Sequence, residues 1–146
     1  MPGAEVVVVA LAQRLFVLVF VGVNDFTART SSRQWADNLR KVVSLLKTRF
    51  QARDILLASV PPMHQFPALP QPLRRWLGAR AKRLNRIMRH IPQDNAACRF
   101  IPVIFPADKV YVVVDGFHPG AAAYTLWADR IAEIIQSELE AVATSF

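Results

Sequence analysis

The sequence has few of the residues on which several classes of protein depend. Its 146 residues include a single cysteine, Cys98, which excludes an internal disulfide and any zinc site built from several cysteines. Cys98 stands in an apolar run, so we expect a buried, unreactive thiol. Only five glycines are present, and the sequence contains no phosphate-binding glycine loop, nucleotide fingerprint or metal-binding cluster. We therefore expect no cofactor and no metal.

Acidic residues are outnumbered by basic ones, 11 against 18, which gives a formal net charge of +7. This balance allows contact with nucleic acid or an anionic surface, but it bears first on solubility and electrostatic steering. A helix expected over residues 72–90 carries a row of basic residues opposite an apolar stripe that includes Leu73 and Trp76, so a solvated outer face is the simpler interpretation of the basic row. No helix-turn-helix, RNP or zinc pattern is present, and we expect no nucleic-acid partner.

The N-terminal region lacks an unbroken hydrophobic span. Residues 5–23 are strongly apolar, but Gln13 and Arg14 stand at their centre, where a charge is costly in hydrocarbon. The first charged residue is Glu5, whereas a secretory signal begins with a basic region. We predict two buried strands, 5–11 and 14–23. A membrane location is not expected, a membrane-anchored fragment is the weaker alternative, and a cytoplasmic location is favoured.

Strands and helices alternate along the rest of the chain, and the hydrophobic fraction of 53% is enough for one domain. The apolar runs and breaks predict a helix from Ser31 or Ser32 to about Phe50, and then a strand over 54–60 that is buried on both faces. A proline-rich loop over 61–72 and a helix to His90 follow. The last two elements are a strand near 98–105, bent or placed at an edge by Pro102, and a final helix with Pro119 in its first turn. This alternation indicates an α/β fold with a parallel sheet covered on both faces.

Two polar segments follow strand-like runs and contain residues suited to acyl chemistry. In "DGFHPG" (115–120), the imidazole of His118 can take a proton from a hydroxyl nucleophile while Asp115 fixes its tautomer. In "GVNDFT" (22–27), Asn24 offers an amide donor to an oxyanion and Gly22 allows close approach of a substrate. Sites in parallel sheets form at the carboxyl ends of strands, so we expect both segments to converge.

Each segment also has a simpler interpretation. Asn24 followed by Asp25 is a common cap or turn after a strand. A pattern of Asp115 and His118 is short enough to arise by chance, and a lone histidine is more often structural than catalytic. The pairing of the two segments, each at the end of a strand, favours the functional interpretation. For His64, in the proline-rich loop, a place at a substrate entrance and a plain surface position are both left open.

The sequence resembles the SGNH (GDSL-type) hydrolases over roughly residues 17–140. "VFVGVNDFT" is similar to their G-x-N-D block, and "VDGFHPGAAAYTLWADRIAEII" is similar to their D-x-x-H-P block and the helix after it. The segment "ILLASVPPMHQFPALPQPLRRWLGARAKRLN" fits the esterase-like branch. The resemblance implies a flavodoxin-like three-layer α/β/α domain with a partial parallel sheet that hydrolyses small-molecule carboxylic esters, thioesters or related acyl compounds. It further implies that His118 is the general base, Asp115 orients it, Asn24 lies in the oxyanion hole and Gly22 shapes the pocket.

The family's nucleophile block is missing from this chain. Members carry the catalytic serine in a G-D-S block directly after their first strand, and no serine here follows Gly-Asp. Ser59, at the end of a strand, is the least implausible substitute, but its neighbours match the ordinary family pattern and we interpret it as structural. The serines available are Ser31, Ser32, Ser44, Ser59, Ser137 and Ser145. We therefore identify no nucleophile and expect weak or no activity.

The first strands of the family's sheet would also be missing, which would expose a long apolar edge. Residues 5–11 could fold back as a replacement strand, two copies could pair as a homo-oligomer, or the chain could be a shortened form. We expect one SGNH-hydrolase-like domain over 1–146, with 1–13 as an atypical apolar extension. The alternative is a non-catalytic interaction or structural module that assembles through the exposed sheet edge.

Overall fold

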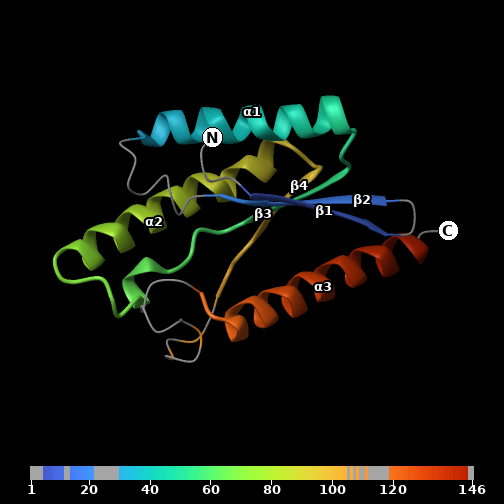
Figure 1. Ribbon diagram of the computed structural model, residues 1–146. Helices are drawn as coiled ribbons and strands as arrows, with labels where there is room; N and C mark the ends of the chain where they lie inside the picture. The colour runs from blue at the N-terminus through green and yellow to red at the C-terminus, as the bar shows by residue number, and fades with distance from the viewer. Residues whose placement is uncertain are drawn as a thin grey trace. The chain divides into compact units, whose positions relative to one another are not determined.

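The computed structural model describes residues 5–11, 14–21, 30–104, 106, 108, 111 and 119–144. The chain divides into two compact units, which are described separately: Met1–His64 with Gln71–Ile104, and Gln65–Pro70 with Phe105–Phe146. The elements of the described part (Figure 1) are β1 (Glu5–Leu11), β2 (Arg14–Phe20), α1 (Ser32–Phe50), β3 (Asp54–Ala58), the 3₁₀ turn η2 (Met63–Gln65), α2 (Leu73–His90), the 3₁₀ turn η3 (Ile91–Asp94), β4 (Cys98–Ile101) and α3 (Ala121–Ala143).

The described strands form one sheet in the order β1-β2-β3-β4. β2, β3 and β4 run parallel, and Ala58 at the end of β3 pairs with Phe20 of β2 and Ile101 of β4. The three carboxyl ends therefore lie at the same edge of the sheet. This arrangement confirms the predicted α/β fold with a partial parallel sheet of the flavodoxin-like kind.

β1 runs antiparallel to β2, with Glu5 opposite Phe20 and Leu11 opposite Arg14. It therefore covers the edge of β2 that the missing family strands would leave open, as one of the three alternatives proposed. The prediction that β1 is buried is wrong in part, because the Val8 side chain is 56% exposed. A strand at the end of a sheet has one neighbouring strand and is packed less completely than a central one.

α1 forms where the sequence predicts it. The hydroxyl of Ser31 accepts a hydrogen bond from the Gln34 backbone at 3.2 Å, and the Gln34 side chain accepts one from the Ser31 backbone at 3.1 Å. This capping box supplies partners for amides that the first turn leaves free. The buried face of α1 consists of Trp35, Leu39, Val43 and Leu46. All five residues of β3 are buried, as the continuous apolar run predicts.

α1 and α2 cover the sheet of the first unit and contact each other (Figure 1). The connections through α1 and α2 each move one strand in the same direction, so right-handed crossovers place both helices on the same face. The buried side of α2 contains Leu77, Gly78, Ala81, Leu84 and Met88.

Two residues expected on this apolar side are exposed instead. Leu73 is 43% exposed and Trp76 is 56% exposed. At 100° per residue, Trp76 points about 120° away from the centre of the buried arc, which takes it out of the core. Its ring lies beside the guanidinium of Arg80, 5.8 Å from the ring centroid.

α3 belongs to the second unit. Gly120 is its N-cap, so Pro119 precedes the helix and does not stand in its first turn as predicted. In α3, Ile135 is buried, whereas Tyr124 is 58% and Val142 39% exposed. The rings of Tyr124 and Trp127 pack edge to face with their centroids 5.7 Å apart. Among the helices of the described residues, none combines the length and apolar character needed to cross a bilayer.

Candidate functional site

The carboxyl edge of the parallel strands is the part of the sheet from which the first predicted block extends. β2 ends at Phe20, and Val21, the next residue, is buried with 6% of its surface exposed. Gly22 follows directly in the sequence. Gly22 and Asn24 lie outside the described residues, so their roles stay predictions. The structure shows the parallel pairing of β2 and β3, which places the carboxyl ends of the two strands at the same edge of the sheet.

The second predicted block directly precedes α3. Asp115 and His118 also lie outside the described residues. On either side of them, the backbone amide of Gly120 donates a hydrogen bond to the carbonyl of Tyr111 at 2.9 Å. This bond brings the two ends of the segment that carries Asp115 and His118 next to each other. The two blocks belong to different compact units, and their convergence stays a prediction.

A cavity of about 150 Å³ opens beside the ends of β3 and β4 within the first unit. His64 lines this cavity and is exposed, so a place at a substrate entrance and a plain surface position both stay open for it. The apolar part of the wall includes Phe100 from β4, over which the Arg89 guanidinium lies at 5.1 Å. The polar lining residues are Ser59, His64, Lys82, Asn85 and Arg89.

Asn85 joins α2 to the chain that leaves β3. Its Oδ1 accepts a hydrogen bond from the Val60 amide at 2.7 Å, and its Nδ2 donates one to the Val60 carbonyl at 3.0 Å. An asparagine amide can satisfy both backbone groups of one residue because it carries a donor and an acceptor. The role of Asn85 was not predicted from the sequence. Its position beside Leu84, as a lone amide on a helix whose other residues are apolar or basic, could have indicated a specific polar contact.

Gly78 allows a second close contact at the same place. A Cβ atom added to Gly78 would lie 2.8 Å from the Cβ of His64, closer than two such atoms approach in proteins. The absence of a side chain therefore lets α2 approach η2. Asn85 and Gly78 together fix α2 against the segment that follows β3.

A match to a known protein family identifies the family to which this chain belongs. The sequence matches the model of the GDSL-like Lipase/Acylhydrolase family over residues 3–126, which is most of the chain. This chain belongs to that family. No curated protein and no solved structure gives a significant match. The resemblance drawn from the two sequence blocks is thereby confirmed, and the family is one of hydrolases that act on esters and related acyl compounds.

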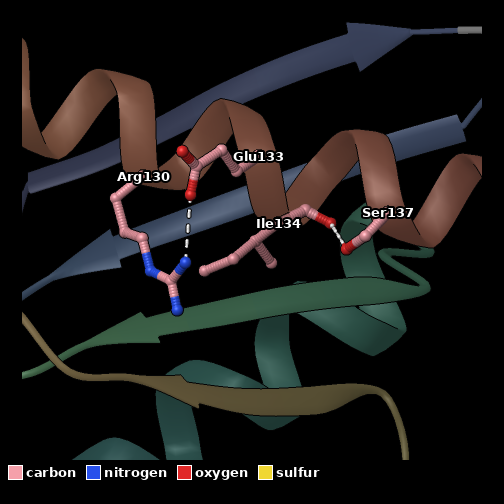
Figure 2. Close-up of polar contacts among 4 residues, drawn as sticks. All are labelled: Arg130, Glu133, Ile134 and Ser137. Atoms are coloured by element: carbon pink, nitrogen blue, oxygen red, sulfur yellow. Dashed lines mark hydrogen bonds and ion pairs between the residues drawn. The ribbon is translucent and has the colours of Figure 1, made fainter.

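The GDSL-like chain uses the hydroxyls of several serines for local structure. The Oγ of Ser59 accepts a hydrogen bond from the Val103 amide at 2.7 Å, and the residue is only 8% exposed. Ser137 donates to the Ile134 carbonyl at 2.8 Å within α3, one turn from the ion pair between Arg130 and Glu133 (Figure 2). These contacts agree with a structural interpretation of Ser59.

Ser31 caps α1, and Ser32 and Ser44 lie on that helix. Ser145 lies outside the described residues.

Cys98 is the other side chain of this GDSL-like chain that could act as a nucleophile. It lies at the start of β4 with 3% of its surface exposed. Burial raises the pKa of its thiol to about 11, and the nearby charge of Lys47 opposes this in part. The thiolate is the reactive form, and a raised pKa disfavours it at neutral pH. The predicted burial of the Cys98 thiol is confirmed.

Proposed function

We propose that this chain is an acyl-hydrolase domain for small-molecule carboxylic esters or related acyl compounds, and that it is inactive or weak by itself. The observation that carries the proposal is the family match over residues 3–126, which spans both sequence blocks. The parallel register of β2, β3 and β4 supports it, because sites in such sheets form at the carboxyl edge.

The proposed roles follow from the chemistry of each side chain. His118 is the general base, and Asp115 orients its ring and stabilises the imidazolium that forms. Asn24 donates a hydrogen bond to the oxyanion of the tetrahedral intermediate. Gly22 shapes the pocket beside Asn24 because it has no side chain there to exclude the substrate.

A chain without a nucleophilic serine can assist only the attack of water. In this reaction His118 takes a proton from water while the water oxygen bonds to the acyl carbon. The tetrahedral intermediate then expels the alcohol oxygen, to which the imidazolium returns the proton. No acyl-enzyme forms, so the two easier steps of nucleophilic catalysis are lost. We therefore expect rates far below those of a complete serine hydrolase.

Hydrolysis of p-nitrophenyl acetate tests these roles in the full chain. We expect turnover only slightly above the buffer reaction, with any excess removed by His118→Ala and by Asn24→Ala. His90→Ala is the matched control, because His90 is exposed at the end of α2 and should change nothing.

Robust turnover abolished by His118→Ala would show that another residue acts as nucleophile and would refute the proposed inactivity. Excess turnover that survives both His118→Ala and Asn24→Ala would refute the proposed site. Ser59→Ala should leave any residual rate unchanged because the Ser59 oxygen already accepts the Val103 amide.

The alternative function is a non-catalytic module that assembles through its sheet edge. The observation that favours it is the position of β1 at the end of the described sheet, with Val8 56% exposed. Light scattering distinguishes the two functions: strand pairing predicts a dimer that Val8→Lys dissociates, since a charge on an edge strand opposes edge-to-edge pairing. A strictly monomeric chain would contradict the alternative.

A further inference from the structure

The charge of α2 differs from that of the other helices. Its 18 residues include seven arginines and lysines and no acidic residue. In α1 the Arg40 guanidinium lies 3.5 Å from the Asp37 carboxylate, and in α3 Arg130 and Glu133 lie 3.0 Å apart. α2 thus offers its basic residues no acidic neighbour one turn away.

Four of these basic residues lie on α2 away from the side buried on the sheet, and one of them, Lys82, also lines the cavity beside the ends of β3 and β4. Arg75, Lys82, Arg83 and Arg86 are all exposed, and at 100° per residue they lie within an arc of about 100°. In the part of the chain that the structure describes, none of the four charged groups has an ion-pair partner. We call these four residues, together with Trp76, the cationic face.

Repulsion within the cationic face opposes the helix that carries it. Arg86 follows Lys82 by four positions and Arg83 by three, and like charges at these spacings are neighbours on a helix. The helix is held in spite of this repulsion by its buried side and by Asn85. An anionic partner would relieve the repulsion without any change in fold.

The apolar residue beside the cations indicates which anionic partner fits. Trp76 lies about 20° from Arg83 around the helix and is 56% exposed. Tryptophan beside lysine and arginine is the combination found where proteins meet the interface of a bilayer. A nucleic-acid duplex offers phosphates to the cations but no apolar phase for the exposed Trp76 side chain.

We propose that the cationic face of α2 docks on an anionic lipid surface, with the four cations on the headgroups and Trp76 at the acyl boundary. The net charge of +7 is compatible with an anionic surface, and the exposed tryptophan and the lack of acidic residues on α2 indicate this helix as the place of contact. The proposal does not depend on hydrolytic activity. It requires only that α2 keeps the exposed side seen in the first unit.

Flotation with lipid vesicles tests the proposal on the full chain. We expect binding to phosphatidylserine-containing vesicles in low salt, loss of binding in high salt, and no binding to pure phosphatidylcholine. Each cation at such a surface strengthens binding about five-fold, so Arg75, Arg83 and Arg86 changed together to Gln should weaken it roughly 100-fold. Trp76→Ala should weaken it in addition, without altering its salt dependence.

The matched control removes the same charge from α1. Arg33, Lys41 and Arg49 are exposed on that helix, and their joint change to Gln should reduce vesicle binding far less than the α2 triple variant. Equal losses from the two triple variants would overturn the proposal, because net charge alone would then explain binding. If the α2 triple variant does not fold, Arg83→Gln and Arg86→Gln singly carry the same test at about five-fold each.

Three other outcomes would also overturn the proposal. They are an absence of binding to phosphatidylserine vesicles in low salt, binding to a DNA duplex in place of vesicles, and self-association that the α2 triple variant abolishes. Failure of the esterase assay would leave this proposal untouched, and failure of vesicle binding would leave the proposed hydrolase site untouched.

Discussion

α1 and α2 are of similar length, 19 and 18 residues, and cover the same face of the sheet, but they are fixed in different ways. α1 has local signals at its start: a capping box between Ser31 and Gln34. α2 has no side-chain cap at Pro72 and depends on residues distant in sequence. Its Asn85 binds Val60, 25 positions away.

The difference shows which part of the molecule positions the carboxyl edge. α1 would form at its place from its own sequence, since caps and a buried stripe are enough to define a helix on a sheet. α2 is joined to the residue after β3 through Asn85 and approaches η2 through Gly78. The contacts of α2 therefore set the shape of the cavity at the edge from which the proposed site extends.

The largest effect that separates the helices is expected from Asn85→Ala. It removes two hydrogen bonds and leaves the amide and carbonyl of Val60 without protein partners, at a cost of about 2–3 kcal/mol in the free energy of unfolding. Urea denaturation measures this cost. Asn95→Ala is the control. The side-chain oxygen of Asn95 accepts a local hydrogen bond from the Ala97 amide at 3.3 Å, and its loss should lower the free energy of unfolding by less than about 1 kcal/mol. Equal losses at the two asparagines would contradict the special role of Asn85.

Gly78→Ala is expected to have an intermediate effect. Alanine favours a helix by about 1 kcal/mol over glycine, but a new Cβ against His64 costs roughly 1–3 kcal/mol, so we expect a net loss. The double variant with His64→Gly should recover stability, because it removes the opposing Cβ. A gain in stability from Gly78→Ala alone would show that α2 does not need this close approach.

Ser31→Ala is expected to have the smallest effect, about 1 kcal/mol, because it removes one half of the capping box of α1. Hydrogen exchange should show the loss confined to the first turn of α1, whereas Asn85→Ala should raise exchange in α2. Ser44→Ala, on the exposed side of α1, should stay within about 0.5 kcal/mol. Loss of protection in α2 from Ser31→Ala would remove the distinction between the helices.

Local patterns predicted much of the fold. The continuous apolar run predicted β3, and the cap and stripe predicted α1. Pro102 predicted either a bend or an edge position, and β4 ends just before it as the last strand of the described sheet. These features depend on neighbouring residues in the sequence and on burial. Both are visible in the spacing of apolar residues along the chain.

Contacts between distant residues were not predictable in the same way. The bond from Asn85 to Val60 and the approach of Gly78 to His64 depend on how α2 lies over the sheet. The exposure of Val8 depends on the position of β1 at the end of the sheet.

For the candidate site, the sequence predicted the family and the two blocks that carry its chemistry. The family is confirmed by the match over residues 3–126. The roles of Gly22, Asn24, Asp115 and His118 remain predictions. The structure adds three features of the described residues: the shared strand edge, the bond between Gly120 and Tyr111, and the cavity that His64 lines.

The antiparallel direction of β1 decides which of its two ends lies at the carboxyl edge of the parallel strands. Leu11, at the end of β1, pairs with Arg14, which begins β2, so the two lie at the amino edge of the parallel strands. Seven residues of strand span about 23 Å, and a side chain placed after β1 would be separated from the carboxyl edge by that length. Glu5, in contrast, pairs with Phe20 at the carboxyl edge. For the proposed site at the carboxyl edge, a nucleophile could therefore not come from the end of β1 at Leu11, which lies at the opposite edge.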